Sequence, residues 1–232
     1  MNVLVACEES QEVCKAFRAR GHRAFSADLQ ECSGGHPEWH IQGDVLPLLN
    51  GNCSFQTADK HTHTQTGRWD LIIGFPPCTY MTNASAVRMT VKGKLQMERY
   101  KNAMLAKEFF FEIYRADCPR VAIENPTPLG IVELPPPSQV IQPYEFGHPY
   151  SKRTCLWLRG LPQLKPTEIL TDYVPFVNAG CKDAHGNQRK RQGRKERDQK
   201  SRSKTFPGIA NAMADQWGNI TELQLSLFDG GI

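Results

Sequence analysis

The chain has 232 residues, of which 40% are hydrophobic and 22% are charged. This length and composition predict one globular domain with a sizeable core, and they exclude a disordered chain. No apolar run approaches the roughly 20 residues of a membrane-spanning helix, and the first residues turn acidic where a signal peptide would stay apolar. We therefore expect a cytoplasmic protein without a membrane partner.

The first third of the chain predicts three strands and one helix. Short apolar runs predict buried strands, since each is too short for a helix and is bounded by polar residues. These runs cover residues 2–6, 23–27 and 69–74. Apolar residues at helical spacing predict a helix over 10–20, which Gly21 would end. The polar stretch 51–68 shows no clear period, and we expect a long loop or an insertion there.

The rest of the chain continues this alternation. A long amphipathic pattern predicts a helix over 95–114, and an apolar run predicts a strand over 120–124. Two further strands are expected over 139–144 and 154–158, followed by a closing helix over 207–217. Alternating strands and helices predict an α/β fold with a mainly parallel sheet and helices on both faces.

Eight cysteines are scattered along the chain without a dense framework, so we expect reduced thiols that are mostly small and buried. Two loose sets of potential metal ligands occur. They are Cys32, His36 and His40, and Cys53, His61 and His63. Neither set has the paired spacing typical of a zinc site, and we expect no metal.

Polar residues follow several of the predicted strands. In an open parallel sheet, ligands bind beyond the carboxyl ends of the strands. Asp28 ends the second strand, where a carboxylate suits the hydroxyls of a ribose, and Asp44 suits an adenine amino group. Both aspartates are also typical of ordinary turns, which is the alternative interpretation.

Cys78 follows Pro76 and Pro77 after the strand over 69–74. Two prolines stiffen the backbone, so the thiol is held on a rigid turn and becomes a candidate nucleophile if its pKa is lowered. An inert, buried cysteine is the alternative. Glu124 ends the next strand and is a candidate acid, because an enclosed carboxyl has a raised pKa. A capping or turn carboxylate is its alternative.

Several motifs resemble those of DNA (cytosine-5-)-methyltransferases, and they follow the order that this family uses. The segment GFPPCTYMTNAS (74–85) resembles the catalytic turn, and AIENPTPLG (122–130) resembles the Glu-Asn-Val motif. Farther on, GHPYSKRTCLWLRG (147–160) is similar to the Gln-x-Arg-x-Arg stretch, and IANAMADQW (209–217) is similar to the closing helix. The resemblance spans most of the chain and is that of a compact member with a reduced target-recognition region.

The resemblance implies a Rossmann-like, S-adenosylmethionine-dependent methyltransferase acting on C5 of cytosine in DNA. Cys78 would form a covalent adduct with C6 of a flipped-out base. Glu124 would bind N3 and the exocyclic amine, and Arg153 would hold O2. The segment from Thr79 to about Leu95 would close over the base. The implied cofactor is S-adenosylmethionine, the implied partner is double-stranded DNA, and we expect a monomer.

The resemblance also implies two sets of contact residues. The cofactor contacts would be Ala6, Cys7, Glu8, Glu9, Ser10, Asp28, Leu29, Asp44, Val45, Pro76, Asn211 and Ala212. The DNA contacts would be Pro77, Thr79, Asn125, Lys190, Arg191, Arg194 and Lys195. A compact enzyme of this family suits a restriction–modification system or a bacteriophage, hence the cytoplasm of a bacterial or phage-infected host cell.

Positive charge is concentrated towards the C-terminus. The net charge of the chain is +4, but residues 182–204 hold ten basic and three acidic residues, a net charge of +7. Such a segment indicates contact with a polyanion, and a solvated loop is the alternative. We expect a catalytic core over 1–160, a short basic DNA-contact insert over 161–204, and a closing helix with a tail over 205–232.

The sequence departs from the family pattern in ways that bear on function. The loop after the first strand lacks the usual Phe-x-Gly-x-Gly, Thr79 stands where glutamine is common, and Ser151 and Cys155 replace the glutamine and the second arginine of the later stretch. Three alternatives stay open: an amino methyltransferase acting on N4 or N6, a DNA-binding relative without catalysis, and a modifier of free nucleotides.

Overall fold

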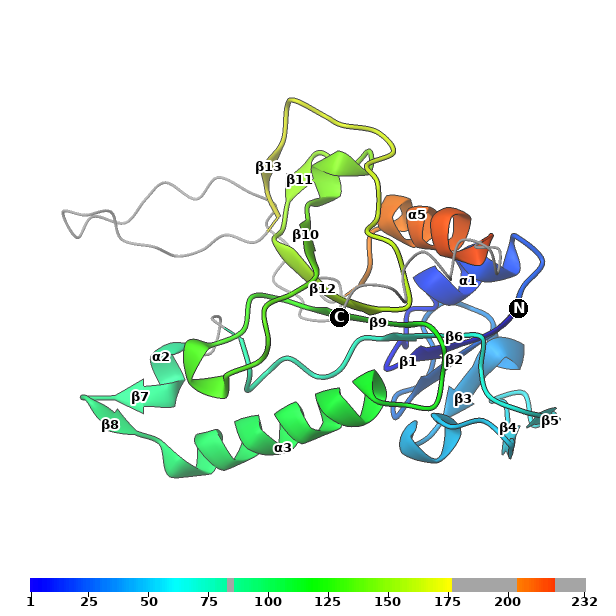
Figure 1. The fold of residues 1–232 in the computed structure, drawn as a ribbon, viewed down its shortest axis with the longest axis horizontal. Helices are drawn as coiled ribbons and strands as arrows, with labels where there is room; N and C mark the ends of the chain where they lie inside the picture. The colour runs from blue at the N-terminus through cyan, green and yellow to red at the C-terminus, as the bar shows by residue number, and fades with distance from the viewer. Residues whose placement is uncertain (83–85, 177–203, 220–232) are drawn as a thin grey trace.

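The computed structural model describes residues 1–82, 86–176 and 204–219, and it is an α/β structure built on one seven-stranded sheet (Figure 1). The strand order is β10-β12-β9-β6-β1-β2-β3. These strands are β1 (Asn2–Ala6), β2 (Arg23–Asp28), β3 (His40–Gln42), β6 (Leu71–Gly74), β9 (Val121–Asn125), β10 (Gln139–Ile141) and β12 (Thr154–Arg159). Strands β9, β6, β1, β2 and β3 run parallel, and β12 pairs antiparallel with β9 and β10. The predicted α/β class and mainly parallel sheet are confirmed.

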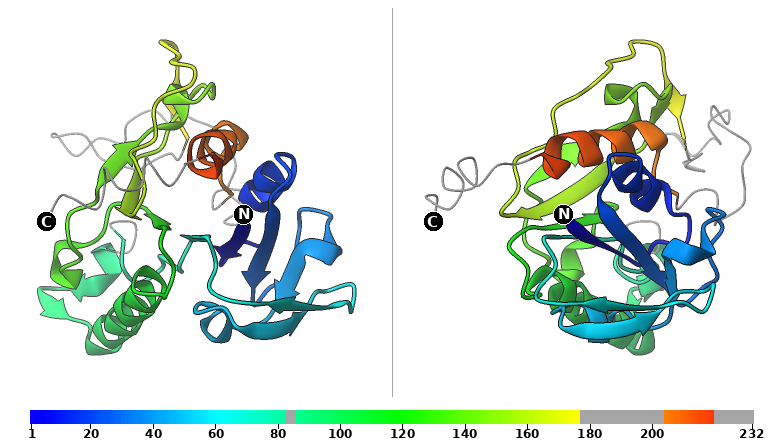
Figure 2. Two further views of the ribbon diagram at one scale, coloured as in Figure 1. Left: turned by 45° about the vertical axis from the view of Figure 1, so that its right-hand side comes forward. Right: turned by 90° about the vertical axis from the view of Figure 1, so that its right-hand side faces the viewer.

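Helices cover both faces of this sheet, as predicted (Figure 2). Helices α1 (Glu12–Arg18) and α5 (Pro207–Gly218) lie side by side on one face, and α3 (Met97–Tyr114) covers the other (Figure 1). Alternation along β1 explains this arrangement, since Val3 and Val5 pack with α1 and α5 while Leu4 packs on the opposite face.

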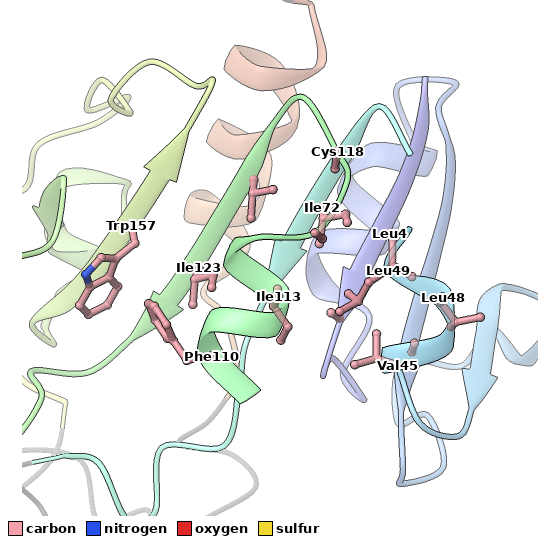
Figure 3. Close-up of a cluster of buried hydrophobic side chains, with 14 of the residues drawn as sticks. Leu4, Val45, Leu48, Leu49, Ile72, Phe110, Ile113, Cys118, Ile123 and Trp157 are labelled. Carbon is pink, nitrogen blue, oxygen red and sulfur yellow. The ribbon is translucent and has the colours of Figure 1, made fainter. Parts of the chain in front are cut away.

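The core on the α3 face contains Phe110 and Ile113 of α3 together with Ile72 of β6 and Ile123 of β9 (Figure 3). Gly74 ends β6 directly against Ile113, whose Cγ2 would lie 2.9 Å from a Cβ at that position. The helix therefore packs close to the sheet beside the strand end that leads to Cys78.

The stretch 51–68, expected as a long loop or an insertion, forms a two-stranded antiparallel hairpin between β3 and β6, so the expectation of a loop was wrong. Its strands are β4 (Cys53–Gln56) and β5 (Thr62–Gln65). Phe55 and Gln65 are buried, while the hydroxyls of Ser54 and Thr64 meet on the exposed face at 3.1 Å. The inward-facing side chains include polar ones, which hid the period of two from the sequence pattern.

Three short elements follow Cys78 where a closing loop was expected. They are α2 (Ala86–Met89) and the hairpin of β7 (Thr90–Val91) and β8 (Lys94–Leu95). A third two-stranded sheet in the described structure pairs β11 (Tyr150–Ser151) with β13 (Val174–Pro175). Short 3-10 turns complete the described structure. These are η1 (Pro37–Trp39), η2 (Leu46–Leu48), η4 (Gly130–Val132) and η5 (Pro143–Glu145).

The start of the expected insert packs on the core. Leu161 and Leu164 are buried in the same cluster as α5, and the indole Nε1 of Trp217 donates to the Pro162 carbonyl at 3.0 Å. Among the described residues, no helix has the length and apolar character to cross a bilayer.

Candidate functional site

The centre of the site is the pair formed by the Cys78 thiol and the Glu124 carboxyl. Strands β6 and β9 are parallel neighbours, with Gly74 in register with Ile123. Cys78 follows the end of β6, and Glu124 lies near the end of β9, so both reach the same edge of the sheet. Burial raises the pKa of Cys78, and the negative charge of Glu124 raises it further, so the lowered pKa expected of a nucleophile is not found here. The Cys78 thiol is thus close enough to Glu124 to sense the charge of its carboxylate.

The turn that carries Cys78 is fixed at both ends by backbone hydrogen bonds. Phe75 N donates to the Ala6 carbonyl at 2.9 Å, and Met81 N donates to the Cys78 carbonyl at 3.1 Å. The Met81 side chain is fully buried. Pro76 is buried, whereas Pro77 and Thr79 are exposed and Cys78 is half-buried. The turn therefore holds the Cys78 thiol in a fixed, half-buried position between two exposed residues, Pro77 and Thr79.

Glu124 lines a small hollow between the sheet and the start of α5. The other lining residues are Lys152, Thr154, Thr205, Phe206, Ile209 and Met213. Burial in this hollow raises the pKa of the Glu124 carboxyl, and the positive charge of Lys152 opposes that rise. A carboxyl in this state holds its proton at higher pH than an exposed glutamate, so it can donate a hydrogen bond.

Lys152, and not Arg153, is the basic residue that faces this pair. The positive charge of Lys152 lowers the pKa of both Cys78 and Glu124. Arg153 is exposed, and its Nε donates to Thr127 Oγ1 at 3.1 Å. Sequence reasoning missed Lys152 because the choice between adjacent residues depends on strand register, which a single sequence does not fix.

Asn125 lies on the other face of β9 from Glu124. It is opposite Cys155 of β12, and Cys155 packs in the core on the α3 face. The Asn125 side chain is 1% exposed, and neither its Oδ1 nor its Nδ2 has a hydrogen-bond partner among the described residues. In this conformation the Asn125 side chain is buried on the α3 face of the sheet and cannot make the expected contact with DNA.

The ends of β1, β2 and β3 bring together the residues expected to bind adenosine. Burial and the charges of Asp28 and Asp44 raise the pKa of Cys7 to about 12, so these three groups lie close together. Asp28 Oδ1 accepts from Gln30 N at 2.9 Å, and Asp44 Oδ1 accepts from Leu46 N at 3.1 Å. These are short local turns, as the alternative interpretation of both aspartates expected.

An apolar side chain lies open beside these carboxylates. Leu29, directly after Asp28, is 75% exposed, although large apolar residues are usually covered. Val45 and Ala6, also expected as cofactor contacts, are buried in the core on the α3 face. Asp28, Asp44 and Leu29 thus form a mixed polar and apolar edge that suits a nucleoside.

The loop between β1 and α1 is built differently from a glycine-rich loop. Cys7 and Gln11 adopt positive φ values of 60° and 58°, which glycine adopts more readily. The Glu8 carboxylate turns inward and accepts from Val13 N at 2.6 Å and from Cys14 N at 3.1 Å. Glu8 therefore caps the N-terminus of α1 from within the chain.

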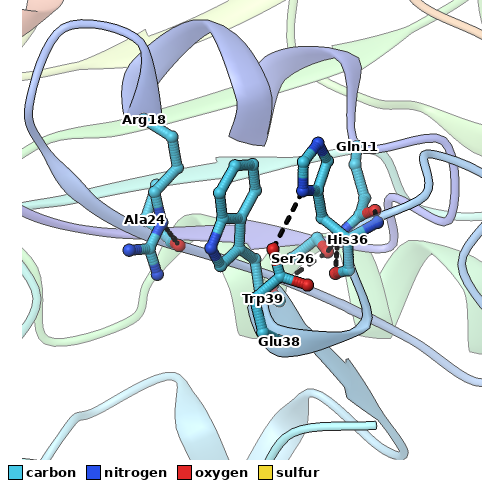
Figure 4. A network of polar contacts seen from close by, with 7 residues as sticks. All are labelled: Gln11, Arg18, Ala24, Ser26, His36, Glu38 and Trp39. Atoms are coloured by element: carbon cyan, nitrogen blue, oxygen red, sulfur yellow. Dashed lines mark hydrogen bonds and ion pairs between the residues drawn. The ribbon is translucent and has the colours of Figure 1, made fainter. Parts of the chain in front are cut away.

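A second segment covers this loop (Figure 4). Gln11 Nε2 donates to the His36 carbonyl at 2.8 Å, and His36 N donates to Gln11 Oε1 at 3.1 Å. The His36 ring stacks on Trp39 at a centroid distance of 3.8 Å. A Cβ on Gly34 would lie 2.5 Å from the Ser10 carbonyl oxygen. Glu8, Glu9 and Ser10 are consequently buried.

The described residues fit the adenosine part of S-adenosylmethionine better than its methionine part. The edge formed by Asp28, Leu29 and Asp44 fits the adenosine part, with carboxylates for the ribose and adenine and an apolar side chain for the ring. The first amides of α1 are different, because Glu8 already occupies those of Val13 and Cys14. The methionine carboxylate would therefore need partners other than these amides.

Helix α5 reaches the site only through its first turns. Ile209 and Met213 line the hollow beside Glu124. Asn211 is exposed and its Oδ1 accepts from Arg20 Nη1 at 3.1 Å, while Ala212 is buried. Arg20 follows the C-terminal end of α1, which is remote from the strand-end loops. The structure thus does not bring Asn211 and Ala212 to the nucleoside edge.

The histidines of the two loose sets have contacts within the protein. His40 is fully buried, with Nδ1 2.9 Å from Ser26 Oγ and Nε2 2.9 Å from the Gln30 carbonyl. His61 pairs with Asp59 at 2.7 Å. In the described part of the chain, no group of three or more acidic, histidine or cysteine side chains is arranged for a metal ion. Lys190, Arg191, Arg194 and Lys195 lie outside the described residues.

Comparison with known proteins adds no relative. No family model matches the chain, and no curated protein matches its sequence.

Proposed function

We propose that this protein is a DNA (cytosine-5-)-methyltransferase with a Rossmann-like methyltransferase fold, using S-adenosylmethionine as its methyl donor. The observation that carries the proposal is the approach of the Cys78 thiol to the Glu124 carboxyl at adjacent strand ends. A nucleophile and a proton donor side by side are what addition to a pyrimidine ring requires.

Cys78 acts as the nucleophile of this reaction. Its thiolate donates an electron pair to C6 and forms the S–C6 bond, while the C5=C6 π pair is made available at C5. S-adenosylmethionine, when bound, would supply the electrophilic methyl group for C5 and would leave as S-adenosylhomocysteine, whose sulfur keeps the electron pair of the broken S–CH3 bond. A base then takes the C5 proton, the C5–H pair restores the C5=C6 bond, and the S–C6 pair returns to sulfur. Cys78 thus ends each cycle as the thiolate.

Glu124 stabilises the ring during this addition. Its raised pKa favours a protonated carboxyl, which donates to N3 while the neighbouring exocyclic amine donates to the other oxygen. Negative charge that develops on the ring is then shared with an enclosed hydrogen bond.

DNA is the substrate that best accounts for the remaining features. Cys78 is half-buried, so a base stacked in a duplex must be flipped out to reach it. The segment 182–204, with a net charge of +7, supplies the phosphate contacts that such a substrate requires.

The test is transfer of a tritiated methyl group from S-adenosylmethionine to unmethylated genomic DNA, followed by nucleoside analysis. We expect 5-methylcytosine from the native protein and at least a 1,000-fold lower rate, by order of magnitude, from Cys78→Ala. Cys53→Ala is the matched control, because Cys53 is also partly exposed but lies on the β4–β5 hairpin.

Two other results would redirect the proposal. Formation of N4-methylcytosine or N6-methyladenine would identify an amino methyltransferase. No transfer together with retained DNA binding would favour a relative without catalysis, a function supported by the capping of α1 by Glu8. Binding of S-adenosylmethionine, measured by calorimetry, separates the latter from a slow enzyme.

A further inference from the structure

We infer that Lys152 is the cation of this site: its ammonium group stabilises negative charge on the Cys78 sulfur and then on the ring to which the sulfur adds. Only the effect of Lys152 on the ring rests on the proposed function. Its effect on the Cys78 thiol requires no bound substrate.

Strand register puts Lys152 on the correct face. In the antiparallel pair of β9 and β12, Glu124 is opposite Leu156, and Asn125 is opposite Cys155. Side chains alternate along a strand, so Thr154 shares the face of Leu156 and Glu124. Lys152 precedes Thr154 by two residues in the extended link from β11, and it lines the same hollow as Glu124 and Thr154.

Lys152 is held by one contact of its side chain and one of its backbone. Its ammonium nitrogen lies 5.9 Å from the centroid of the Phe206 ring, within the range of a cation–π interaction. Its backbone carbonyl accepts from Thr154 Oγ1 at 3.1 Å. Phe206 is in turn packed at 4.8 Å from the ring of Phe176. An aromatic wall and the start of β12 therefore keep the charge beside the hollow.

Of the charged groups that act on the Cys78 thiol in the described part of the chain, one is a cation, and a cation favours the ionised thiol. In the described part of the chain, the charged groups that act on Cys78 are Glu124 from β9 and Lys152 from the β11–β12 link. The residues that α5 and its lead-in segment contribute to the hollow carry no ionisable group. Burial and Glu124 raise the pKa of the thiol, whereas a backbone hydrogen bond at Cys78 and then the charge of Lys152 lower it.

One cation that faces both partners suits the movement of charge in the reaction. When the S–C6 bond forms, negative charge leaves the sulfur and spreads over the ring beside Glu124. Lys152 acts on Cys78 and on Glu124, so it stays close to the charge at both stages. Arg153 does not share this position, because its guanidinium contacts Thr127.

The experiment measures alkylation of Cys78 by iodoacetamide in the full chain between pH 6 and 10, with the Cys78 peptide quantified by mass spectrometry. We expect Lys152→Gln to raise the apparent pKa of the thiol and so to lower the alkylation rate near pH 8 by roughly several-fold. Lys152→Arg should restore most of the rate, because it keeps the charge. Methyl transfer should fall in Lys152→Gln at least as far as alkylation does.

Two comparisons decide the outcome. Lys60→Gln removes one exposed charge on the β4–β5 hairpin and should leave the alkylation profile unchanged. A native profile in Lys152→Gln with unchanged circular dichroism, or an equal loss in Arg153→Gln, would overturn the inference. Alkylation needs neither DNA nor cofactor. If the profile shifts as expected while the native protein makes no 5-methylcytosine, the charge assignment stands and the proposed reaction fails.

Discussion

Glu8 and Glu124 are both enclosed carboxyls, yet their surroundings give them different tasks. Both oxygens of Glu8 accept from backbone amides at the start of α1, so the side chain is committed to the fold. Glu124 faces a thiol, an ammonium group and an open hollow. Glu8 therefore has a structural role, because its partners are backbone amides. Glu124 is the candidate catalytic carboxyl, because its neighbours are reactive and charged side chains.

Glu8 makes the stability of the protein depend on pH. Burial raises its pKa from 4.5 to about 7 in the folded state, so the folded protein binds a proton more tightly than the unfolded chain. This contribution is fully present below about pH 4.5 and is lost as the pH rises through 7. Glu8→Gln removes the titration, and between pH 5 and 8 the native protein should lose about 2–3 kcal/mol more stability than the variant does.

Urea unfolding at several pH values measures this difference. The comparison cancels the other titrating groups, since both proteins share them. Parallel curves of unfolding free energy against pH would mean that the two amides and the helix dipole keep Glu8 charged in the folded protein.

At the scale of elements, the start of α5 forms one wall of the site. Gly208 lies directly against the Phe146 carbonyl, and its amide donates to His148 Nε2 at 2.8 Å. Phe206, two residues earlier, contacts Lys152. The close approach at Gly208 therefore sets the position of the aromatic wall that holds the site cation.

Gly208→Ala should displace this first turn. A Cβ there would overlap the Phe146 carbonyl and approach His148 Nε2 to 2.9 Å, so we expect a loss of about 1–3 kcal/mol despite the better helix propensity of alanine. Gly130→Ala is the matched control, because nothing lies within 4 Å of its Cβ and the change should stay within about 0.5 kcal/mol. Urea unfolding gives both values. Equal stability of the two variants would show that the first turn of α5 shifts to accommodate the added Cβ without loss of stability.

At the scale of the whole molecule, charge and chemistry lie in separate parts of the sequence. The Cys78, Glu124 and Lys152 groups lie at one edge of the sheet, whereas the strongest basic run is 182–204. Lysines and arginines on phosphates give affinity that falls with salt and carry little base specificity. On the proposed function, we therefore expect affinity for DNA to depend on that run more than on the edge that holds Cys78, Glu124 and Lys152.

A fourfold variant tests this division. Changing Lys190, Arg191, Arg194 and Lys195 to glutamine should reduce the slope of log affinity against log salt by up to roughly 3.6, or about 0.9 for each phosphate that the variant no longer neutralises. Lys60→Gln with Arg68→Gln, which removes exposed charge near the hairpin, should leave the slope unchanged. Fluorescence anisotropy with a labelled duplex measures both, and an unaltered slope in the fourfold variant would place the phosphate-binding residues elsewhere.

Local patterns in the sequence determined most of the elements and the candidate nucleophile. The expected helix over 95–114 is α3 (Met97–Tyr114), and the closing helix over 207–217 is α5 (Pro207–Gly218). Apolar runs and periods are properties of neighbouring residues, so they can be read without a fold. The prolines before Cys78 likewise mark a rigid turn wherever the turn comes to lie.

Tertiary structure alone decided which of these residues meet. Register between β9 and β12 puts Lys152 on the face of Glu124 and turns Asn125 beneath the sheet. The inward turn of Glu8 onto α1 removes a carboxylate that the sequence made available for a cofactor. Both results depend on pairings between segments distant in the chain, and a shift of one residue in register reverses which side chains share a face. The sequence therefore determined the elements and the candidate nucleophile, and the packing of those elements decided the partners.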